Sequence, residues 1–141
     1  MYKPKYFKIK ELVNAEILKN TPESVLWLIF DDRLLMCADL IREKCGVCTV
    51  NASGLSDCGL RDWTTKTGAK YSAHKFGRAL DLHIRSIELE FAGNKAGKVK
   101  AYNKVREVLM ADKRFECLNF ENNISWLHID TFNRPSRLFN P

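Results

Sequence analysis

Two short stretches of the chain hold the kinds of residue that bind metal ions. SAHKFGRALD runs from Ser72 to Asp81, and SWLHID runs from Ser125 to Asp130. Together they supply two histidines and a carboxylate, namely His74, Asp81 and His128. A catalytic zinc ion typically takes three protein ligands of these types and keeps a fourth position for water. The sequence therefore predicts a zinc site formed by these three residues.

Strands are expected to position two of the three ligands. Apolar residues alternate at Leu80, Leu82 and Ile84, a pattern typical of a strand with one buried face. Asp81 then lies on the opposite, polar face. The run 126–131 alternates in the same way and places His128 on its polar face, beside Asp130. His74 precedes Asp81 by seven residues with Gly77 between them, so a loop must double back to bring them together.

A hydrolytic zinc site also needs a general base and a group that holds the substrate. Glu121 lies seven residues before His128, at the end of a mostly apolar run, and is the first candidate for the base; Glu116 is the alternative. Arg61 lies in a loop-like segment, where its guanidinium could make a two-pronged contact with a substrate carboxylate. Arg78, within the first stretch, is the other candidate for that role.

Both stretches resemble motifs of a known family. SAHKFGRALD matches the Ser-x-His-x-x-Gly-x-Ala-x-Asp motif of the zinc D-Ala-D-Ala carboxypeptidases and phage L-alanyl-D-glutamate endopeptidases, which share a hedgehog-type zinc peptidase fold. SWLHID is similar to their terminal Trp-x-His motif. YFKIKELV looks like the family's opening helix, and the segment from CGLRDW to GAKYSAH resembles the loop that carries an arginine. The resemblance covers roughly residues 6–132.

The resemblance implies roles for five residues and a substrate. It implies that His74, Asp81 and His128 bind zinc, that Glu121 is the base, and that Arg61 binds substrate or polarises the scissile carbonyl. The implied substrate is the peptidoglycan stem peptide, as for a phage lysin or a bacterial murein peptidase. A non-catalytic zinc-bearing module of the same fold is the alternative. The sequence leaves open which bond is cut and whether the cut is internal or terminal.

Three further residues near the motifs have secondary candidate roles. Ser72 could hold the substrate or support the metal site. Asp130 could orient a metal-bound imidazole of His128, and His83, on the same strand face as Asp81, could reach the cleft.

Composition limits the partners of the chain. The 141 residues are 45% hydrophobic and 28% charged, as in a globular protein, and we expect one domain over 1–141. The formal charge of +6 favours a polyanionic partner, either nucleic acid or the bacterial cell wall. The basic helix near the C-terminus carries one aromatic residue, Tyr102, so we expect no specific nucleic-acid binding.

The sequence also indicates the compartment. No run approaches the roughly 20 apolar residues of a membrane span, and no signal peptide is visible. We therefore expect a protein that is cytoplasmic as synthesised; a phage-encoded protein that is later released to the wall would share these features. Five cysteines, including Cys45 and Cys48 in a CGVC sequence, are expected to be reduced thiols, with Cys48 buried at the start of a strand. Nothing in the sequence sets the oligomeric state, and a monomer is the default expectation.

The expected fold is α+β, with a small, mainly antiparallel sheet that carries the metal site and helices packed on one side. Helices are predicted over 8–19, 22–44 and 99–111, the second with a possible break at Asp31-Asp32. Its core face is predicted to include Val25, Leu28 and Ile29. Strands are predicted over 47–52, 79–84, 117–120 and 126–131. A loop over 53–71, a flexible connection or lid over 88–100 and a surface extension over 133–141 complete the expectation.

Overall fold

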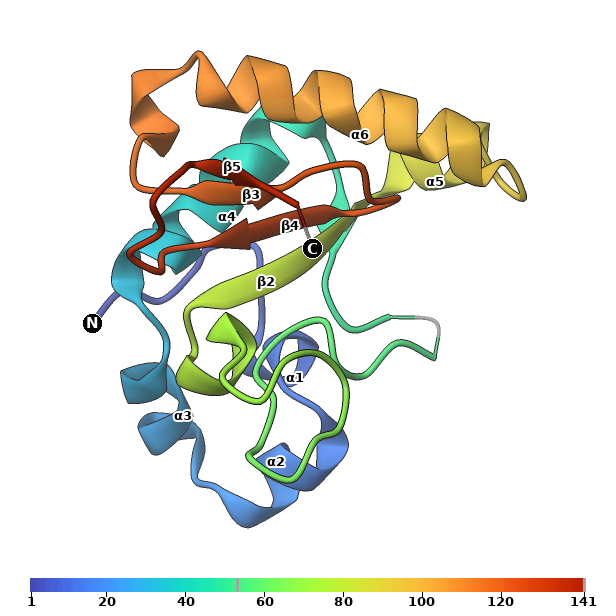
Figure 1. The fold of residues 1–141 in the computed structure, drawn as a ribbon. Helices are drawn as coiled ribbons and strands as arrows, with labels where there is room; N and C mark the ends of the chain where they lie inside the picture. The colour runs from blue at the N-terminus through green and yellow to red at the C-terminus, as the bar shows by residue number, and fades with distance from the viewer. Residues whose placement is uncertain (53, 141) are drawn as a thin grey trace.

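The structure, a computed structural model, describes residues 1–52 and 54–140 and combines helices with one five-stranded sheet (Figure 1). The α-helices are α1 (Ile9–Leu12), α2 (Ala15–Asn20), α3 (Glu23–Ile29), α4 (Asp32–Cys45), α5 (Arg85–Glu90) and α6 (Lys95–Met110). Short 3-10 helices are η1 (Ala73–Phe76) and η2 (Lys113–Phe115). The strands are β1 (Cys48–Thr49), β2 (Ala79–Ile84), β3 (Asn119–Glu121), β4 (Leu127–Asp130) and β5 (Leu138–Phe139). The predicted α+β class is confirmed.

The sheet has the strand order β1-β2-β4-β3-β5 and is antiparallel except where β5 runs parallel to β3. In the register between β2 and β4, Asp81 faces His128 directly. Because side chains alternate across a strand, the neighbours Leu80, Leu82 and Ile129 point to the opposite face, where all three are fully buried. The two central strands therefore present one apolar face and one face that carries two candidate metal ligands.

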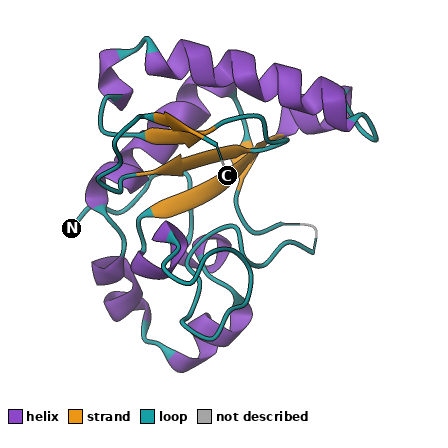
Figure 2. Ribbon diagram, in the orientation of Figure 1, coloured by secondary structure: helices purple, strands orange, loops and turns teal. Residues whose placement is uncertain are grey.

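Helices α4 and α6 cover the apolar face of the sheet (Figure 1). The same hydrophobic core includes Leu34, Leu35, Ala38 and Ile41 from α4, and Tyr102 and Leu109 from α6. The described part of the segment between β1 and η1 is almost entirely loop and lies below β2 in the view, beside η1 and the N-terminal helices (Figure 2). This agrees with the predicted loop over its described part, 54–71; Ser53 lies outside the described residues.

The N-terminal helices differ from the prediction in two ways. Residues 8–19 form two helices, because Val13 is extended and pairs with Leu60, and the side chain of Asn14 then caps α2. The next predicted helix, over 22–44, is interrupted at Phe30, which confirms the break near Asp31-Asp32. Three residues predicted for the core face of its first part are instead exposed, namely Val25, Leu28 and Ile29. The separate helix α3 buries Leu26 and Trp27 in their place.

The predicted lid over 88–100 is wrong. Helix α5 occupies its start and α6 begins at Lys95, so only a short turn separates the two helices. Glu88 joins them by pairing with Lys98 and by accepting a hydrogen bond of 2.7 Å from the hydroxyl of Tyr102. The helix predicted over 99–111 is confirmed, with four more residues at its start.

The described part of the predicted surface extension, 133–140, lies at the surface, but it is more regular than expected. Leu138 and Phe139 form β5 at the edge of the sheet. The side chain of Arg137 donates to the main-chain oxygens of Leu118 and Phe115, at 3.0 and 2.7 Å. These contacts hold the tail against the β3 edge of the sheet. Among the described residues, no helix has both the length and the apolar character needed to cross a membrane.

Asp31 connects the start of α4 to two segments that follow the candidate ligands His74 and His128, at Gly77 and at Thr131. One carboxylate oxygen caps α4 by accepting from the main-chain N–H of Arg33 at 2.9 Å, and the other accepts from the hydroxyl of Thr131 at 2.9 Å. The main-chain N–H of Asp31 donates to Gly77 at 3.0 Å. Burial acts to raise the pKa of Asp31, but hydrogen bonds from Arg33 and Thr131 outweigh it and lower this pKa to about 2.

We expect Asp31→Ala to lower the free energy of unfolding by about 1–3 kcal/mol at neutral pH, because a helix cap and a buried partner are both lost. Asp32→Ala, which removes a neighbouring carboxylate that is 46% exposed, should cost less than about 1 kcal/mol. A carboxylate with a lowered pKa stabilises the fold above its unfolded pKa and loses that contribution as pH falls. Urea titrations should therefore show the gap between wild type and Asp31→Ala narrowing from about pH 4 towards pH 2. A gap that stays constant over this range would contradict the assignment.

Candidate metal centre

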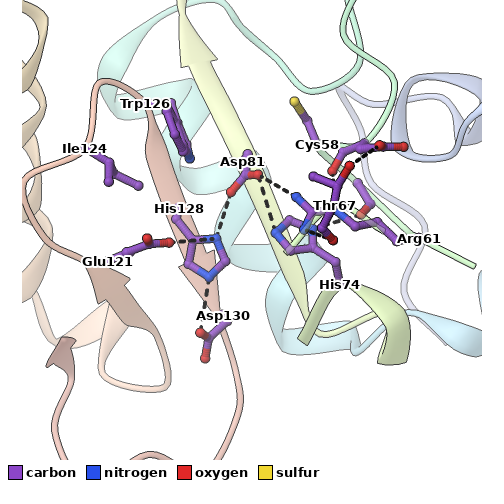
Figure 3. A network of polar contacts seen from close by, with 12 residues as sticks. Cys58, Arg61, Thr67, His74, Asp81, Glu121, Ile124, Trp126, His128 and Asp130 are labelled. Atoms are coloured by element: carbon purple, nitrogen blue, oxygen red, sulfur yellow. Dashed lines mark hydrogen bonds and ion pairs between the residues drawn. The ribbon is translucent and has the colours of Figure 1, made fainter. Parts of the chain in front are cut away.

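The structure brings the three predicted ligands together. His74, Asp81 and His128 are all buried, and one potential ligand atom from each lies within 4.8 Å of the other two. Nδ1 of His128 is 2.7 Å from Oδ1 of Asp81, and Nε2 of His74 is 3.4 Å from Oδ2 of the same carboxylate (Figure 3). The imidazole centroids are 5.2 Å apart. A buried cluster with this donor set can hold a metal ion.

A tight reversal of the chain at Gly77 places His74 beside the strand that bears Asp81. His74 lies in η1, and the helix ends at Gly77 in the left-handed conformation, with φ of 65°. A side chain at Gly77 would place its Cβ 2.4 Å from the main-chain oxygen of Ile29, so only glycine fits. Nδ1 of His74 lies 2.9 Å from the main-chain oxygen of Gly59. A proton on Nδ1 satisfies this contact and leaves Nε2 free to face the metal position.

His128 is oriented from its other side by Asp130. Nε2 of His128 lies 3.2 Å from Oδ2 of Asp130 (Figure 3). Asn119 and Arg134 hold that carboxylate with hydrogen bonds of 2.8 and 2.7 Å. A carboxylate behind a ligating imidazole fixes the ring and makes its free nitrogen a better donor. The arrangement therefore presents Nδ1 of His128 to the metal position.

The electrostatics of the cluster favour a cation. Burial acts to raise the pKa of Asp81, but its contacts with the imidazoles of His128 and His74 outweigh this effect and hold the pKa well below its usual range. Burial acts to lower the pKa of His128, and its hydrogen bonds to Asp130 and Asp81 reverse the effect and raise this pKa to about 9. Two buried carboxylates thus attract positive charge to the imidazole between them, either a proton or a metal ion.

A cavity of about 490 Å³ opens beside the cluster, and its lining includes all three cluster residues. Glu121, at the end of β3, also lines it, with its Oε2 3.9 Å from Nδ1 of His128. Glu116, the alternative base, is exposed beyond η2 and is not among the lining residues. The geometry therefore favours Glu121 of the two candidates for the base.

Of the two candidate arginines, Arg61 lies in the cavity. It is buried, and its Nη2 is 3.2 Å from Oδ2 of Asp81. The main-chain oxygens of Asp57 and Thr67 accept from Nε and Nη1 at 2.5 and 3.4 Å. Arg78 instead points away from the cluster, donating to Thr131 and stacking on Phe132, and does not line the cavity.

The remaining candidates divide between the cavity and its surroundings. Ser72 lines the cavity. His83 lies outside the cluster: its Nε2 is 3.7 Å from the thiol of Cys58, and its Nδ1 is 3.5 Å from Glu88. Cys48 is fully buried at the start of β1, and the five cysteines are free thiols, as expected.

Sequence reasoning missed the groups that hold the ligands from behind. Gly59 contacts His74 through its main-chain oxygen, so no residue type in the sequence could indicate this contact. Arg134 lies four residues after Asp130 in a segment expected to be a surface extension, and its guanidinium also stacks 3.8 Å from the ring centroid of Phe139. The four-residue spacing between Asp130 and Arg134 is the feature of the sequence that could have indicated this ion pair. Comparison of the chain with protein-family models, with curated proteins and with solved structures found no match in any of the three.

Proposed function

We propose that the protein is a zinc-dependent peptidase that hydrolyses an amide bond in peptidoglycan stem peptides. The observation that carries the proposal is the buried cluster of His74, Asp81 and His128 beside a cavity that also holds a carboxylate outside the cluster. Two histidines and one carboxylate form a donor set that catalytic zinc sites use. Three protein ligands leave a coordination position free for the reaction.

Each of the residues around the cavity has a separate role in the proposed reaction. Zinc, when bound, would lower the pKa of a water molecule and polarise the scissile carbonyl. Glu121 accepts the proton of the attacking water and returns it to the leaving amine, so that the amine departs neutral. Arg61 donates to the negative charge that develops on the carbonyl oxygen, since its guanidinium faces the same cavity. Asp130 and Gly59 hold the two imidazoles in place.

The stem-peptide substrate is inferred from the family resemblance of the two motifs and from the charge of the chain. Six residues of the two motifs line the cavity, namely Ser72, Ala73, His74, Asp81, Trp126 and His128, and Asp130 contacts His128 from behind. A net charge of +6 favours association with the anionic bacterial wall. Both features suit a phage lysin or a bacterial murein peptidase that acts on the wall.

The test is mass spectrometry of the soluble products released from purified peptidoglycan. We expect stem-peptide fragments with the zinc-loaded protein, none with a chelator present, and recovery when zinc is added back. The fragment masses identify the bond that is cut. A protein that holds one zinc ion and releases nothing would contradict the proposal and favour a non-catalytic zinc-bearing module.

A further inference from the structure

A second cavity adjoins the cavity beside the cluster and contains a thiol and an imidazole that the proposed reaction does not use. Its volume is about 340 Å³, and Cys58 and His83 are among its lining residues. Its lining, within the described part of the chain, includes neither His74 nor His128. Asp81 lines both cavities, and in the view of Figure 3 Cys58 and His128 lie on opposite sides of it. The second cavity therefore borders the candidate metal centre but has polar groups of its own.

Cys58 and His83 present a sulfur and a nitrogen at the separation that one metal ion requires. Sγ of Cys58 is 3.7 Å from Nε2 of His83. Zinc binds sulfur at about 2.3 Å and imidazole nitrogen at about 2.0–2.1 Å, so a tetrahedral angle at the metal sets these two atoms about 3.6 Å apart. The observed separation also suits a hydrogen bond from the thiol to the imidazole. A zinc ion can therefore replace the thiol proton with little movement of either side chain.

The ring of His83 is supported in the way that is typical of a metal ligand. Its Nδ1 lies 3.5 Å from Oε1 of Glu88, which leaves Nε2 to face the thiol. Glu88 is itself held by Lys98 and by the hydroxyl of Tyr102. A carboxylate behind an imidazole fixes its tautomer and makes the other nitrogen a better ligand. His128 in the cluster has a carboxylate behind it in the same way.

The charges around the thiol favour a dication. Burial raises the pKa of Cys58 to about 11, and the carboxylates of Asp81 and Asp57 add to this effect. Both carboxylates line the second cavity, where a cation would offset their charge and stabilise the thiolate. Thiolate and imidazole ligands suit zinc, whereas magnesium and calcium prefer oxygen ligands. Because Cys58 and His83 supply two ligands where the cluster supplies three, the ion should bind only in excess zinc and dissociate on dialysis.

We infer that Cys58 and His83 bind a second zinc ion, more weakly than the cluster binds the first, and that this ion inhibits the reaction. The site rests on the geometry of the second cavity, whereas the inhibition rests on the proposed function. Arg61 lines both cavities, and its proposed role is to donate to the carbonyl oxygen of the substrate. A dication in the second cavity repels this guanidinium. Excess zinc should therefore slow the reaction that the first zinc ion supports.

Titration with cobalt(II) tests the site without any measurement of activity. Cobalt replaces zinc and gives an intense near-ultraviolet charge-transfer band when sulfur is a ligand, and the cluster offers only nitrogen and oxygen. We expect wild type to develop the band only after the first equivalent of cobalt has bound, and Cys58→Ser to lack it. In His83→Ala the band should require at least about tenfold more cobalt.

Cys45→Ser is the control for the cobalt titration. Cys45 is a partly exposed free thiol that lines neither cavity, so this variant should keep the band. A wild-type protein without the band in excess cobalt would overturn the inference. So would a Cys58→Ser variant that keeps the band, or a natively folded His83→Ala variant that develops it at the wild-type cobalt concentration.

The rate of fragment release from peptidoglycan tests the inhibition. Excess zinc should lower kcat of wild type by at least about tenfold, because a donor to the developing oxyanion is displaced. Cys58→Ser should keep, in excess zinc, the rate that it shows with one equivalent. An equal loss of rate in both proteins would overturn the inhibitory role. If neither protein releases fragments with one equivalent of zinc, the proposed function fails, and the cobalt titration still decides whether the second site exists.

Discussion

His74→Ala is expected to remove stoichiometric zinc from the purified protein. The substitution deletes one of three ligands and leaves Asp81 and His128, which is too few to hold zinc against competition. Loss of an outer partner behind a ligand typically costs 10–100-fold in metal affinity, so loss of the ligand should weaken zinc binding by more than about 100-fold. Elemental analysis of the dialysed protein, followed by titration against a chromogenic chelator, measures both the stoichiometry and the affinity.

The third histidine of the chain provides a matched control. His83 lies on the same strand as Asp81 but contacts Cys58 and Glu88 rather than the cluster. His83→Ala should therefore keep one zinc ion per chain. Asp81→Asn, which nearly preserves shape while removing a charge, should lose zinc as His74→Ala does. Zinc retained by His74→Ala with a native circular dichroism spectrum, or lost from His83→Ala, would show that the ligand set is wrong.

The clustering of the three candidate ligands could be predicted because the signals that place them are local. Alternation of apolar residues fixes which face of a strand a side chain occupies, and this was sufficient for Asp81 and His128. The two strands that carry these residues are expected to be neighbours in one sheet, because their apolar faces must be buried against the same core. The turn at Gly77 was visible as a glycine between two ligands. What sequence alone could not give was the register that sets Asp81 opposite His128.

The failed predictions concern segments whose structure depends on distant partners. The predicted core face of α3 was wrong at Leu28, because the break at Phe30 allows α3 to turn independently of α4. The turn before α6 looked like a lid because its polar residues and glycines carry no packing signal, yet Glu88 ties α5 to α6. The tail forms a strand because its hydrogen-bond partners lie far from it in the sequence: β5 pairs with β3, and Arg137 donates to Leu118 and Phe115, which precede it by 19 and 22 residues. Propensity is a weak guide where tertiary contacts decide the outcome.

The loop that carries Arg61 shows the same limit inside the site. Its sequence indicated a loop and a functional guanidinium, but the side chain's position depends on three acceptors, Asp57, Thr67 and Asp81. Gly68 contributes by its lack of a side chain, since a Cβ there would lie 2.7 Å from Nη1 of Arg61. The pairing with Asp81 means that Arg61 contacts a candidate metal ligand as well as lining the cavity. The motif resemblance implies only a role toward the substrate.

Glu121→Gln is expected to separate metal binding from catalysis. Glu121 lines the cavity beside the cluster but is not one of the three candidate ligands, so the variant should keep one zinc ion per chain. A glutamine has nearly the same shape as a glutamate and cannot accept a proton at catalytic pH. Removal of a general base typically costs about 10²–10⁴-fold in rate, and the loss should appear in kcat. The measurement is the rate of fragment release from peptidoglycan, with zinc content determined on the same samples.

Glu116→Gln is the control that tells the two candidate bases apart. Glu116 is exposed and lies outside the cavity lining, so its substitution should leave both zinc content and kcat at wild-type values. If Glu116→Gln is the inactive variant, the base lies outside the cavity and the reaction geometry proposed for Glu121 is wrong. If Glu121→Gln loses zinc together with activity, Glu121 acts as a fourth ligand, and a base must be sought elsewhere. Only retained zinc with lost turnover identifies Glu121 as the group that moves the proton, because a ligand or a merely structural residue would change the metal content or the fold as well.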